Sequence, residues 1–439
     1  MPKLCTMTML VLAMLCAGAA WADENWPQWR GPNLTGYVET SGLPVSWSET
    51  ENIVWKTALP SWSGSTPAIW GDRIFLTSPS QGDEGGPGAD ATRPSVGEQI
   101  LLLCLDKGNG AILWQRHLDT GNENIGKQND SSPSPMTDGK HVWVMTGTGI
   151  VTAFDMDGEA LWRRNIQEEY GDFGHQFGYG ASPLLHGDML IIPVLHGYHT
   201  EDPSYLVALD GLSGESRWRV ERSTDAELES PDAYTTPVPL TSEGETVVVV
   251  SGGDYVTGHD PATGEEVWRS GGLNPRGIDR NRTIVSPVAC RGMVFAGPRS
   301  SEPMLALRGG GSGDVSTSHL AWKREERHGP DVPTPACDGT YLYLANDRGM
   351  ATCLDAETGD VVWGPERTER GIVSASPLVA DGKVYITNEE AVTTVLAAGP
   401  EFKVLATNKL DPAYTLSSIA VSGSRLYLRT ATHLYCIGE

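Results

Sequence analysis

Side chains that can bind polar ligands gather in short segments between the apolar runs of this chain. Tyrosine, histidine, arginine and carboxylates alternate there with glycine, and together they suit a polar small molecule or a peptide. The segments are 170–180, 196–199, 229–234, 252–255, 281–283, 328–331, 346–348, 388–390 and 411–415. The candidate ligand-binding residues in them are His175, Tyr179, Asp232, Tyr234, Asp254, Tyr255, Arg282, Asp331, Asp347, Arg348, Glu389 and Tyr414.

Three histidines form an alternative metal site. His196 and His199 stand three residues apart and could bind a metal ion together with His175. Their spacing follows no established metal-binding motif, so we expect no metal and keep these three residues as the alternative.

The carboxylates also have a structural interpretation. Acidic residues just before a strand often cap turns, which applies equally to Asp232 and Asp331. Glu389 and Glu390 are neighbours, and neighbours on a strand face opposite ways, so only one of them can face a ligand. The sequence contains no Gly-x-Ser-x-Gly elbow and no phosphate-binding loop. Catalytic residues therefore stay unassigned.

The polar segments recur at corresponding points of a repeat. Each copy has an apolar run, a glycine-containing turn, a run that alternates β-branched and aromatic residues, a third run, and a fourth that usually ends at tryptophan. Four short strands repeated in this way predict the blades of a β-propeller. In a propeller, the polar segments gather at one end of the central channel, the mouth. Seven copies open on Thr66-Pro67, Ser134-Pro135, Ser182-Pro183, Thr236-Pro237, Ser286-Pro287, Thr334-Pro335 and Ser376-Pro377.

The blade count is eight, because a further opening without proline occurs at 416–420. The chain ends before that blade has a fourth strand, while Ile53–Lys56 has the tryptophan-bearing pattern without a preceding repeat. We therefore predict an all-β propeller of four-stranded antiparallel blades whose last blade is closed by an N-terminal strand. The structural tryptophans of the outermost strands are Trp55, Trp114, Trp162, Trp218, Trp268, Trp322 and Trp363.

Composition limits the partners. The 439 residues include 51 Gly and 29 Pro, typical of many short strands joined by turns. The net charge of −24 would repel a phosphate backbone, so nucleic acid is excluded as a partner. We expect a monomer.

The first residues read as a Sec-type signal peptide. Lys3 precedes an apolar stretch too short to span a bilayer, and a small-x-small site ends at Ala22. We predict a signal peptide over 1–22, an N-terminal extension over 23–49, and the propeller over 50–439 with a flexible insertion at about 78–99. The protein would be periplasmic or secreted, with no transmembrane segment.

The repeat resembles that of quinoprotein-type, PQQ-like eight-bladed propellers. The pattern Asp-x-x-Thr-Gly-x-x-x-Trp is best kept before Trp268 and Trp363, and Trp26-Pro-Gln-Trp-Arg-Gly-Pro32 is similar to the opening of exported proteins of this type. The outer-membrane assembly scaffold BamB shares the architecture. Quinoprotein dehydrogenases hold the quinone against adjacent cysteines and a calcium ion. No two cysteines are adjacent in this sequence, so no cofactor is expected, with PQQ and calcium as the alternative.

The functional prediction is an exported binding or scaffold module. It would take a cell-envelope protein or a small polar or peptide ligand at the mouth, and no catalysis is required. The alternative is an enzyme, either a PQQ-dependent alcohol or sugar dehydrogenase or a metal-assisted one.

Overall fold

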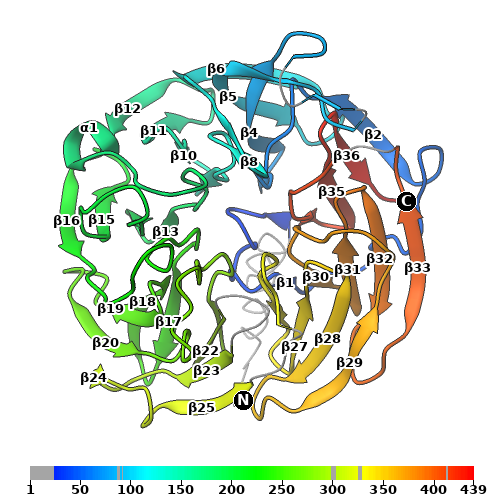
Figure 1. Cartoon of the computed structure of the whole chain (residues 1–439). Helices are drawn as coiled ribbons and strands as arrows, with labels where there is room; N and C mark the ends of the chain where they lie inside the picture. Colours follow the sequence, from blue (N-terminus) through cyan, green and yellow to red (C-terminus); the bar gives the residue numbers. More distant parts are fainter. Residues whose placement is uncertain (1–23, 87–88, 91, 298–302, 325–328, 412–413) are drawn as a thin grey trace, which may run out of the picture.

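The computed structural model describes residues 24–86, 89–90, 92–297, 303–324, 329–411 and 414–439. These residues form a ring of eight β-sheets around a central axis, and each sheet is one blade (Figure 1). The predicted all-β propeller of eight four-stranded antiparallel blades is confirmed. The predicted signal peptide, 1–22, lies outside the described residues.

The first four blades follow one another along the chain, each from its innermost to its outermost strand. Blade 1 has β3 (Ala68–Trp70), β4 (Arg73–Gln81), β5 (Val96–Asp106) and β6 (Ile112–Thr120). Blade 2 has β9 (Met136–Thr137), β10 (His141–Met145), β11 (Ile150–Asp155) and β12 (Ala160–Asn165). Blade 3 has β13 (Leu184–His186), β14 (Met189–Val194), β15 (Tyr205–Asp210) and β16 (Ser216–Glu221). Blade 4 has β17 (Val238–Ser242), β18 (Glu245–Gly252), β19 (Tyr255–His259) and β20 (Glu266–Ser270).

The last four blades repeat this order. Blade 5 has β21 (Val288–Cys290), β22 (Met293–Ala296), β23 (Met304–Arg308) and β25 (Leu320–Arg324). Blade 6 has β26 (Ala336–Cys337), β27 (Tyr341–Ala345), β28 (Met350–Asp355) and β29 (Val361–Arg367). Blade 7 has β30 (Leu378–Ala380), β31 (Lys383–Thr387), β32 (Val392–Ala397) and β33 (Val404–Lys409). Blade 8 has β34 (Ala420–Ser422), β35 (Arg425–Arg429), β36 (His433–Ile437) and β2 (Ile53–Ala58).

A few short elements supplement the blades. β1 (Tyr37–Val38) pairs in parallel with β30, and β24 (Gly313–Asp314) pairs in parallel with β20. β7 (Asn124–Ile125) and β8 (Gln128–Asn129) form a separate hairpin. The short helix α1 (Ile166–Tyr170) begins after Asn165, whose side chain accepts the amides of Gln167 and Glu168. In the part of the chain that the structure describes, no helix is long and apolar enough to cross a membrane.

Local chemistry explains the hairpins, and burial on both faces explains the apolar strands. Asp381 and Gly382 join β30 to β31 with φ values of 50° and 67°, the pair of positive angles that a tight Asp-Gly hairpin turn requires. Leu190, Ile191 and Ile192 of β14 are all fully buried, because both faces of a blade are covered by its neighbours.

An N-terminal strand closes the ring, as predicted. β2 pairs antiparallel with β36, with Lys56 opposite Tyr435, and so becomes the outermost strand of the blade formed by the C-terminus. The indole of Trp55 on β2 donates to the carbonyl of Lys107 in blade 1 at 3.1 Å. Blade 8 therefore joins both ends of the chain and also contacts blade 1.

The predicted insertion at 78–99 is wrong at both ends. β4 continues to Gln81 and β5 begins at Val96, and these two residues pair with each other. Ser78 pairs with Leu101 and Pro79 with Ile100, so the ladder continues into the predicted insertion from both sides. The connection is therefore 82–95.

The N-terminal extension crosses one end of the channel. Residues 26–38, which we call the plug, lie near the centre of the ring and hydrogen-bond to innermost strands of blades 1, 2, 6 and 7, at the end opposite the mouth (Figure 1). The backbone bonds join Trp26 to Ile69, Pro27 to Thr137, Thr35 to Cys337 and Gly36 to Val379, at 2.7 to 3.0 Å.

Candidate binding site

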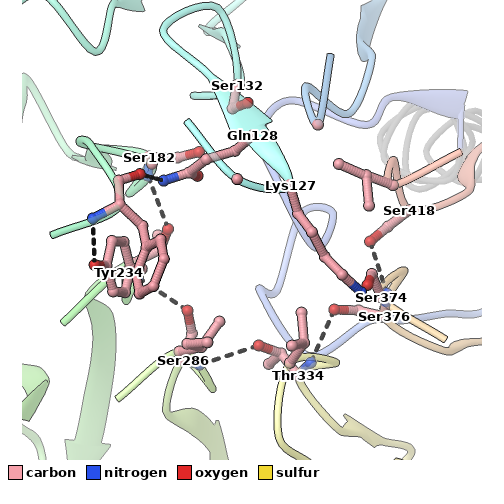
Figure 2. A pocket seen from close by; sticks show the side chains of 18 of the residues that line it. Lys127, Gln128, Ser132, Ser182, Tyr234, Ser286, Thr334, Ser374, Ser376 and Ser418 are labelled. Carbon is pink, nitrogen blue, oxygen red and sulfur yellow. Dashed lines mark hydrogen bonds between the residues drawn. The ribbon is translucent and has the colours of Figure 1, made fainter. Parts of the chain in front are cut away.

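The axis of the propeller holds a cavity of about 480 Å³, in the size range of small-molecule sites. The Ser and Thr residues that open the blades, and the segments just before them, form its wall, and Trp29 of the plug also lines it. Apolar residues line it as well: Ile125, Phe177, Ile284, Val332, Ile372 and Leu416. Figure 2 shows the polar side chains around it.

A closed ring of eight hydroxyl groups surrounds this cavity. The backbone N–H of each opening Ser or Thr donates to the hydroxyl oxygen of the opening residue in the next blade. Figure 2 shows part of this ring, including Ser286, Thr334, Ser376 and Ser418. The distances are 2.9 to 3.3 Å. The cycle runs through Thr66, Ser134, Ser182, Thr236, Ser286, Thr334, Ser376 and Ser418 and returns to Thr66. All of these except Thr66 line the cavity.

The ring explains why Ser or Thr opens every blade. The innermost strands converge at the axis, and the amide before proline would otherwise be buried without a partner. A short hydroxyl side chain from the next blade accepts that amide and keeps its own proton available for donation. The seven hydroxyl groups that line the cavity donate to no other residue that the structure describes. Their protons are therefore available to a ligand in the cavity.

The plug is held by a buried arginine. Arg30 is 2% exposed and donates to the carbonyls of Pro377 and Pro335, both at 2.8 Å. Burial lowers the pKa of Arg30 to about 9, so it remains protonated at neutral pH. These two bonds fix the residue next to Trp29 and therefore hold that indole at the cavity.

One wall of the cavity carries a lysine. Lys127, in the turn between β7 and β8, forms an ion pair of 2.7 Å with Glu389, which also accepts the hydroxyl of Ser374. The side chain of Lys127 is 52% exposed and that of Glu389 is 12% exposed. The cavity therefore reaches solvent beside Lys127.

The cavity is also lined by an arginine. Arg282 forms an ion pair of 2.7 Å with the buried Glu229, and its guanidinium lies 4.9 Å from the centre of the Phe177 ring. The hydroxyl of Tyr234 accepts the backbone amide of Phe177 at 3.2 Å. Burial, with Asp232 nearby, raises the pKa of Tyr234, so the phenol keeps its proton.

Four of the sequence-predicted residues line the cavity together: Tyr234, Arg282, Asp331 and Asp347. Glu389 lies directly behind Lys127. These five come from blades 4 to 7, which shows that the segments before the innermost strands and the loops between second and third strands share one end of the channel.

Asp232 lies inside the wall rather than on the cavity. It is fully buried and accepts three backbone amides: that of Gln176 at 2.7 Å, that of Gly197 at 3.0 Å and that of Tyr198 at 3.1 Å. Burial raises the pKa of Asp232, although these three bonds act in the opposite direction. The structure therefore gives it the capping role that was the alternative interpretation.

His175 and Tyr179 also lie behind the cavity. His175 is 6% exposed and contacts Phe173, Tyr179 and Tyr234 by its ring. Tyr179 donates to the carbonyl of Pro193 at 2.9 Å, which explains why this phenol is buried. Tyr179 packs into the apolar cluster between blades 2 and 3, and His175 lies between it and Tyr234, which enters blade 4.

The three histidines of the alternative metal site are not arranged around one point. The rings of His175 and His196 are 5.7 Å apart, but Nδ1 of His196 accepts the amide of Gly174, and His199 is exposed. Among the residues that the structure describes, no group of three or more His, Cys, Asp or Glu side chains is placed to hold a metal ion.

The remaining predicted residues lie away from the cavity. Asp254 accepts bonds from Ser230, Asn274 and Asn281 in a partly buried network, and burial raises its pKa. Tyr255 lies beside Arg269, 5.3 Å from the guanidinium. Arg348 is exposed.

Tyr414 contacts the connection in blade 1. Its ring lies 4.8 Å from the guanidinium of Arg93 and edge-on to Trp62. Its amide donates to the carbonyl of Thr92 at 3.0 Å. Tyr414 therefore joins 82–95 to the segment that enters blade 8.

Sequence reasoning missed the hydroxyl ring, Lys127 and Trp29 as lining residues. The sequence contained a recognisable pattern for the hydroxyl ring and for Trp29. The Ser/Thr-Pro openings were recognised as a strand start but not as side chains on the axis, and Trp29 stood in a recognised motif. Nothing near Lys127 marks it, because it reaches the cavity through the short β7–β8 hairpin.

The described residues do not match a quinone held by calcium. A quinone that carries carboxylates would need cations to bind them. The two cations at the cavity, Lys127 and Arg282, are each already paired with a glutamate. The adjacent cysteines of the quinoprotein pattern are absent from the sequence. We therefore derive no reaction step through this cofactor.

A comparison with known protein families identifies the family of this chain. The family model described as outer membrane protein assembly factor BamB matches residues 35–169, 97–329 and 308–401, most of the chain. The chain belongs to this family. The predicted PQQ-like, BamB-like propeller is thereby confirmed.

Individual relatives in the BamB family are distant. The outer membrane protein assembly factor BamB of Yersinia pestis is 21% identical over 345 residues, which are 75% of this chain and 77% of that protein. The protein of the same name from Alkalilimnicola ehrlichii is 28% identical over 173 residues, 36% of this chain. The match spans 42% of that relative's length.

Solved structures show the same fold. BamB from Moraxella catarrhalis superimposes with a TM-score of 0.61 at 16% identity, covering 88% of this chain and 99% of that chain. A europium-containing methanol dehydrogenase superimposes with a TM-score of 0.69 at 12% identity, covering 95% and 98%. At these identities the likeness concerns the fold, which scaffold proteins and enzymes share.

Proposed function

We propose that this chain is an exported binding module of the cell envelope whose axial cavity takes a polar ligand or a polar segment of a partner protein. The cavity carries the proposal, because it combines apolar lining residues, unused hydroxyl donors from seven blades and an aromatic side chain, Trp29, supplied by the plug. Such a site can bind without any reacting group.

The family supports an envelope partner. The relatives are named for outer-membrane protein assembly, and in this chain the signal-peptide pattern at 1–22 is consistent with export. We therefore infer that the protein works in the periplasm or outside the cell and that its partners are envelope proteins, small polar molecules or both.

The test compares two matched lysines. Lys127 pairs with Glu389 at 2.7 Å on the cavity, and Lys56 pairs with Glu49 at 2.8 Å on the outer strand β2, with side chains 52% and 41% exposed. Lys127→Gln and Lys56→Gln are each immobilised and exposed to an envelope extract from the source cells, and bound proteins and small molecules are identified by mass spectrometry.

A cavity-dependent partner is the expected result. It would be retained by the wild type and by Lys56→Gln and reduced at least fivefold by Lys127→Gln. The proposal is overturned if every retained molecule binds all three proteins equally, since the cavity would then take no part in binding.

The alternative is a PQQ-dependent alcohol or sugar dehydrogenase, favoured by the fold it shares with methanol dehydrogenase. Adding PQQ and calcium and measuring dye reduction with alcohols and aldoses tests it. Saturable cofactor absorbance together with turnover would establish the enzyme and contradict the binding module.

A further inference from the structure

The chemistry of the cavity narrows the ligand beyond a polar molecule. We propose that the axial cavity is a site for a neutral saccharide; this rests on the proposed binding function. The argument combines the donors of the hydroxyl ring, the charges of the wall and the aromatic side chain of the plug.

The hydroxyl ring favours a ligand with many acceptor oxygens. Each ring oxygen already accepts a backbone amide, so what the seven lining residues offer is mainly O–H donors, spaced around one axis. These side chains are at least 92% buried, and a ligand that enters must replace the water that would otherwise satisfy them. The hydroxyl and ring oxygens of a sugar can accept from several such donors at once.

The charges of the wall disfavour an anion. Lys127 and Arg282 are each neutralised by a glutamate, Glu389 and Glu229. Asp347 also lines the cavity, and no cation among the described residues pairs with its carboxylate, so it adds a negative charge. An anionic ligand would therefore meet a net negative wall in a protein of net charge −24, whereas a neutral one would not.

Asp347 supplies the complementary acceptor. Its carboxylate has no hydrogen-bond partner among the residues that the structure describes, and the side chain is half-buried at the cavity. A sugar hydroxyl can donate to this carboxylate in a charge-assisted hydrogen bond while its oxygen accepts from the ring.

Trp29 supplies the apolar surface. It lines the cavity from the plug and is partly exposed, and the guanidinium of Arg30 lies 6.0 Å from the centre of its ring. One face of a pyranose ring carries mainly C–H groups, which pack well on an aromatic face. The ring donors, the carboxylate of Asp347 and the indole together match the amphipathic surface of a sugar.

Isothermal titration of the full mature chain with trisaccharides of matched size tests the charge preference. The probes are N-acetylglucosamine trimer and maltotriose, both neutral, glucosamine trimer, which is cationic, and galacturonic acid trimer, which is anionic. We expect a neutral trimer to bind at least tenfold more tightly than the anionic one. Its affinity should be unchanged between 50 and 500 mM salt, roughly a threefold change in Debye length.

Two variants test the assigned groups. Asp347→Asn should weaken the neutral trimer about tenfold, the size of about one charge-assisted hydrogen bond, and Trp29→Leu should weaken it at least tenfold while Trp29→Phe retains most of the affinity. Asp157→Asn, an exposed aspartate on the far side of blade 2, is the control and should bind like the wild type. Thermal melts of all variants confirm that the fold is retained.

The outcomes separate this inference from the proposed function. If no neutral trimer binds, or if galacturonic acid trimer binds as tightly, the saccharide assignment is overturned. A short neutral peptide such as Ser-Ala-Ser that binds instead, with the same dependence on Asp347, would also overturn it while the binding module stands. Failure of the binding module itself is shown by the Lys127→Gln comparison, which uses no saccharide.

Discussion

Trp268 shows how one side chain adapts to an irregular neighbour. The other predicted outer-strand tryptophans reach the next blade and donate to a carbonyl there, as Trp218 does to Pro261 at 2.9 Å. Blade 5 replaces the usual turn by the longer segment that contains β24, and the Trp268 indole nitrogen is buried without a partner among the described residues. Trp268 instead lies over Gly258 of its own blade, where any Cβ would overlap the indole.

Removing this indole should cost much of the stability of blade 4. Trp268 is 1% exposed, and we expect Trp268→Ala to lower the free energy of unfolding by roughly 3–5 kcal/mol, as for other buried tryptophans. Urea denaturation measures the change. Gly258→Ala should also destabilise, by displacing the ring. A Trp268→Ala protein that unfolds at the wild-type urea concentration would contradict the packing role.

His175 links protonation to folding. Burial, with a smaller contribution from His196, lowers the pKa of His175 to about 3, below its ordinary value of about 6.5. Between these values the unfolded chain binds a proton that the folded chain does not, so the stability from this residue is complete above about pH 6.5 and is lost as the pH falls toward 3.

The expected effect is a difference in acid sensitivity. From pH 7 to pH 5 the wild type should lose about 2 kcal/mol of unfolding free energy through His175, and His175→Gln should lack this loss. Urea titrations at the two pH values measure it. Equal losses in both proteins would show that folding does not lower the pKa of His175.

At the scale of elements, the join between blade 8 and blade 1 is made by a strand, an indole and an arginine. β2 completes blade 8, and Trp55 on it bonds to blade 1. Arg429 of β35 is 1% exposed and donates to the carbonyls of Thr77 and Ser61 at 2.6 and 3.1 Å. The first and last blades are thus joined by backbone and by side chains.

Arg429→Met should open this join. It removes one donor from the carbonyl of Thr77 and one from that of Ser61, which still accepts the hydroxyl of Ser78 at 3.1 Å. We therefore expect a loss of about 1–3 kcal/mol and faster proteolysis between β2 and β3. Arg425→Met on the same strand, where the side chain is partly exposed, is the matched control. If both variants unfold alike, the two carbonyl bonds do not hold the join.

At the scale of the whole molecule, charge and closure favour a single chain. The net charge of −24 opposes self-association, and closure pairs the edge that would otherwise be left between the first and last blades. Sedimentation equilibrium should therefore give the mass of one chain at both 50 and 500 mM salt. A dimer that persists in low salt would contradict this prediction.

The repeat was readable from the sequence because its residues act locally. Proline fixes the entry to seven of the innermost strands, glycine permits the turns, and tryptophan marks most outer strands, so eight blades and the role of Ile53–Lys56 followed from spacing alone. The flexible segment was drawn too long, since residues 78–81 and 96–99 have loop-like composition but find strand partners in each other.

The cavity depended on the tertiary structure. Loop composition grouped Tyr234, Arg282, Asp331 and Asp347, which line one cavity, but it could not separate them from Asp232 and His175, which point into the wall. The sequence by itself determined the blades, because each is a local pattern of turns and strands. Only the closed ring decided which side chains share the axis, since that requires eight distant openings and the plug to meet at one point.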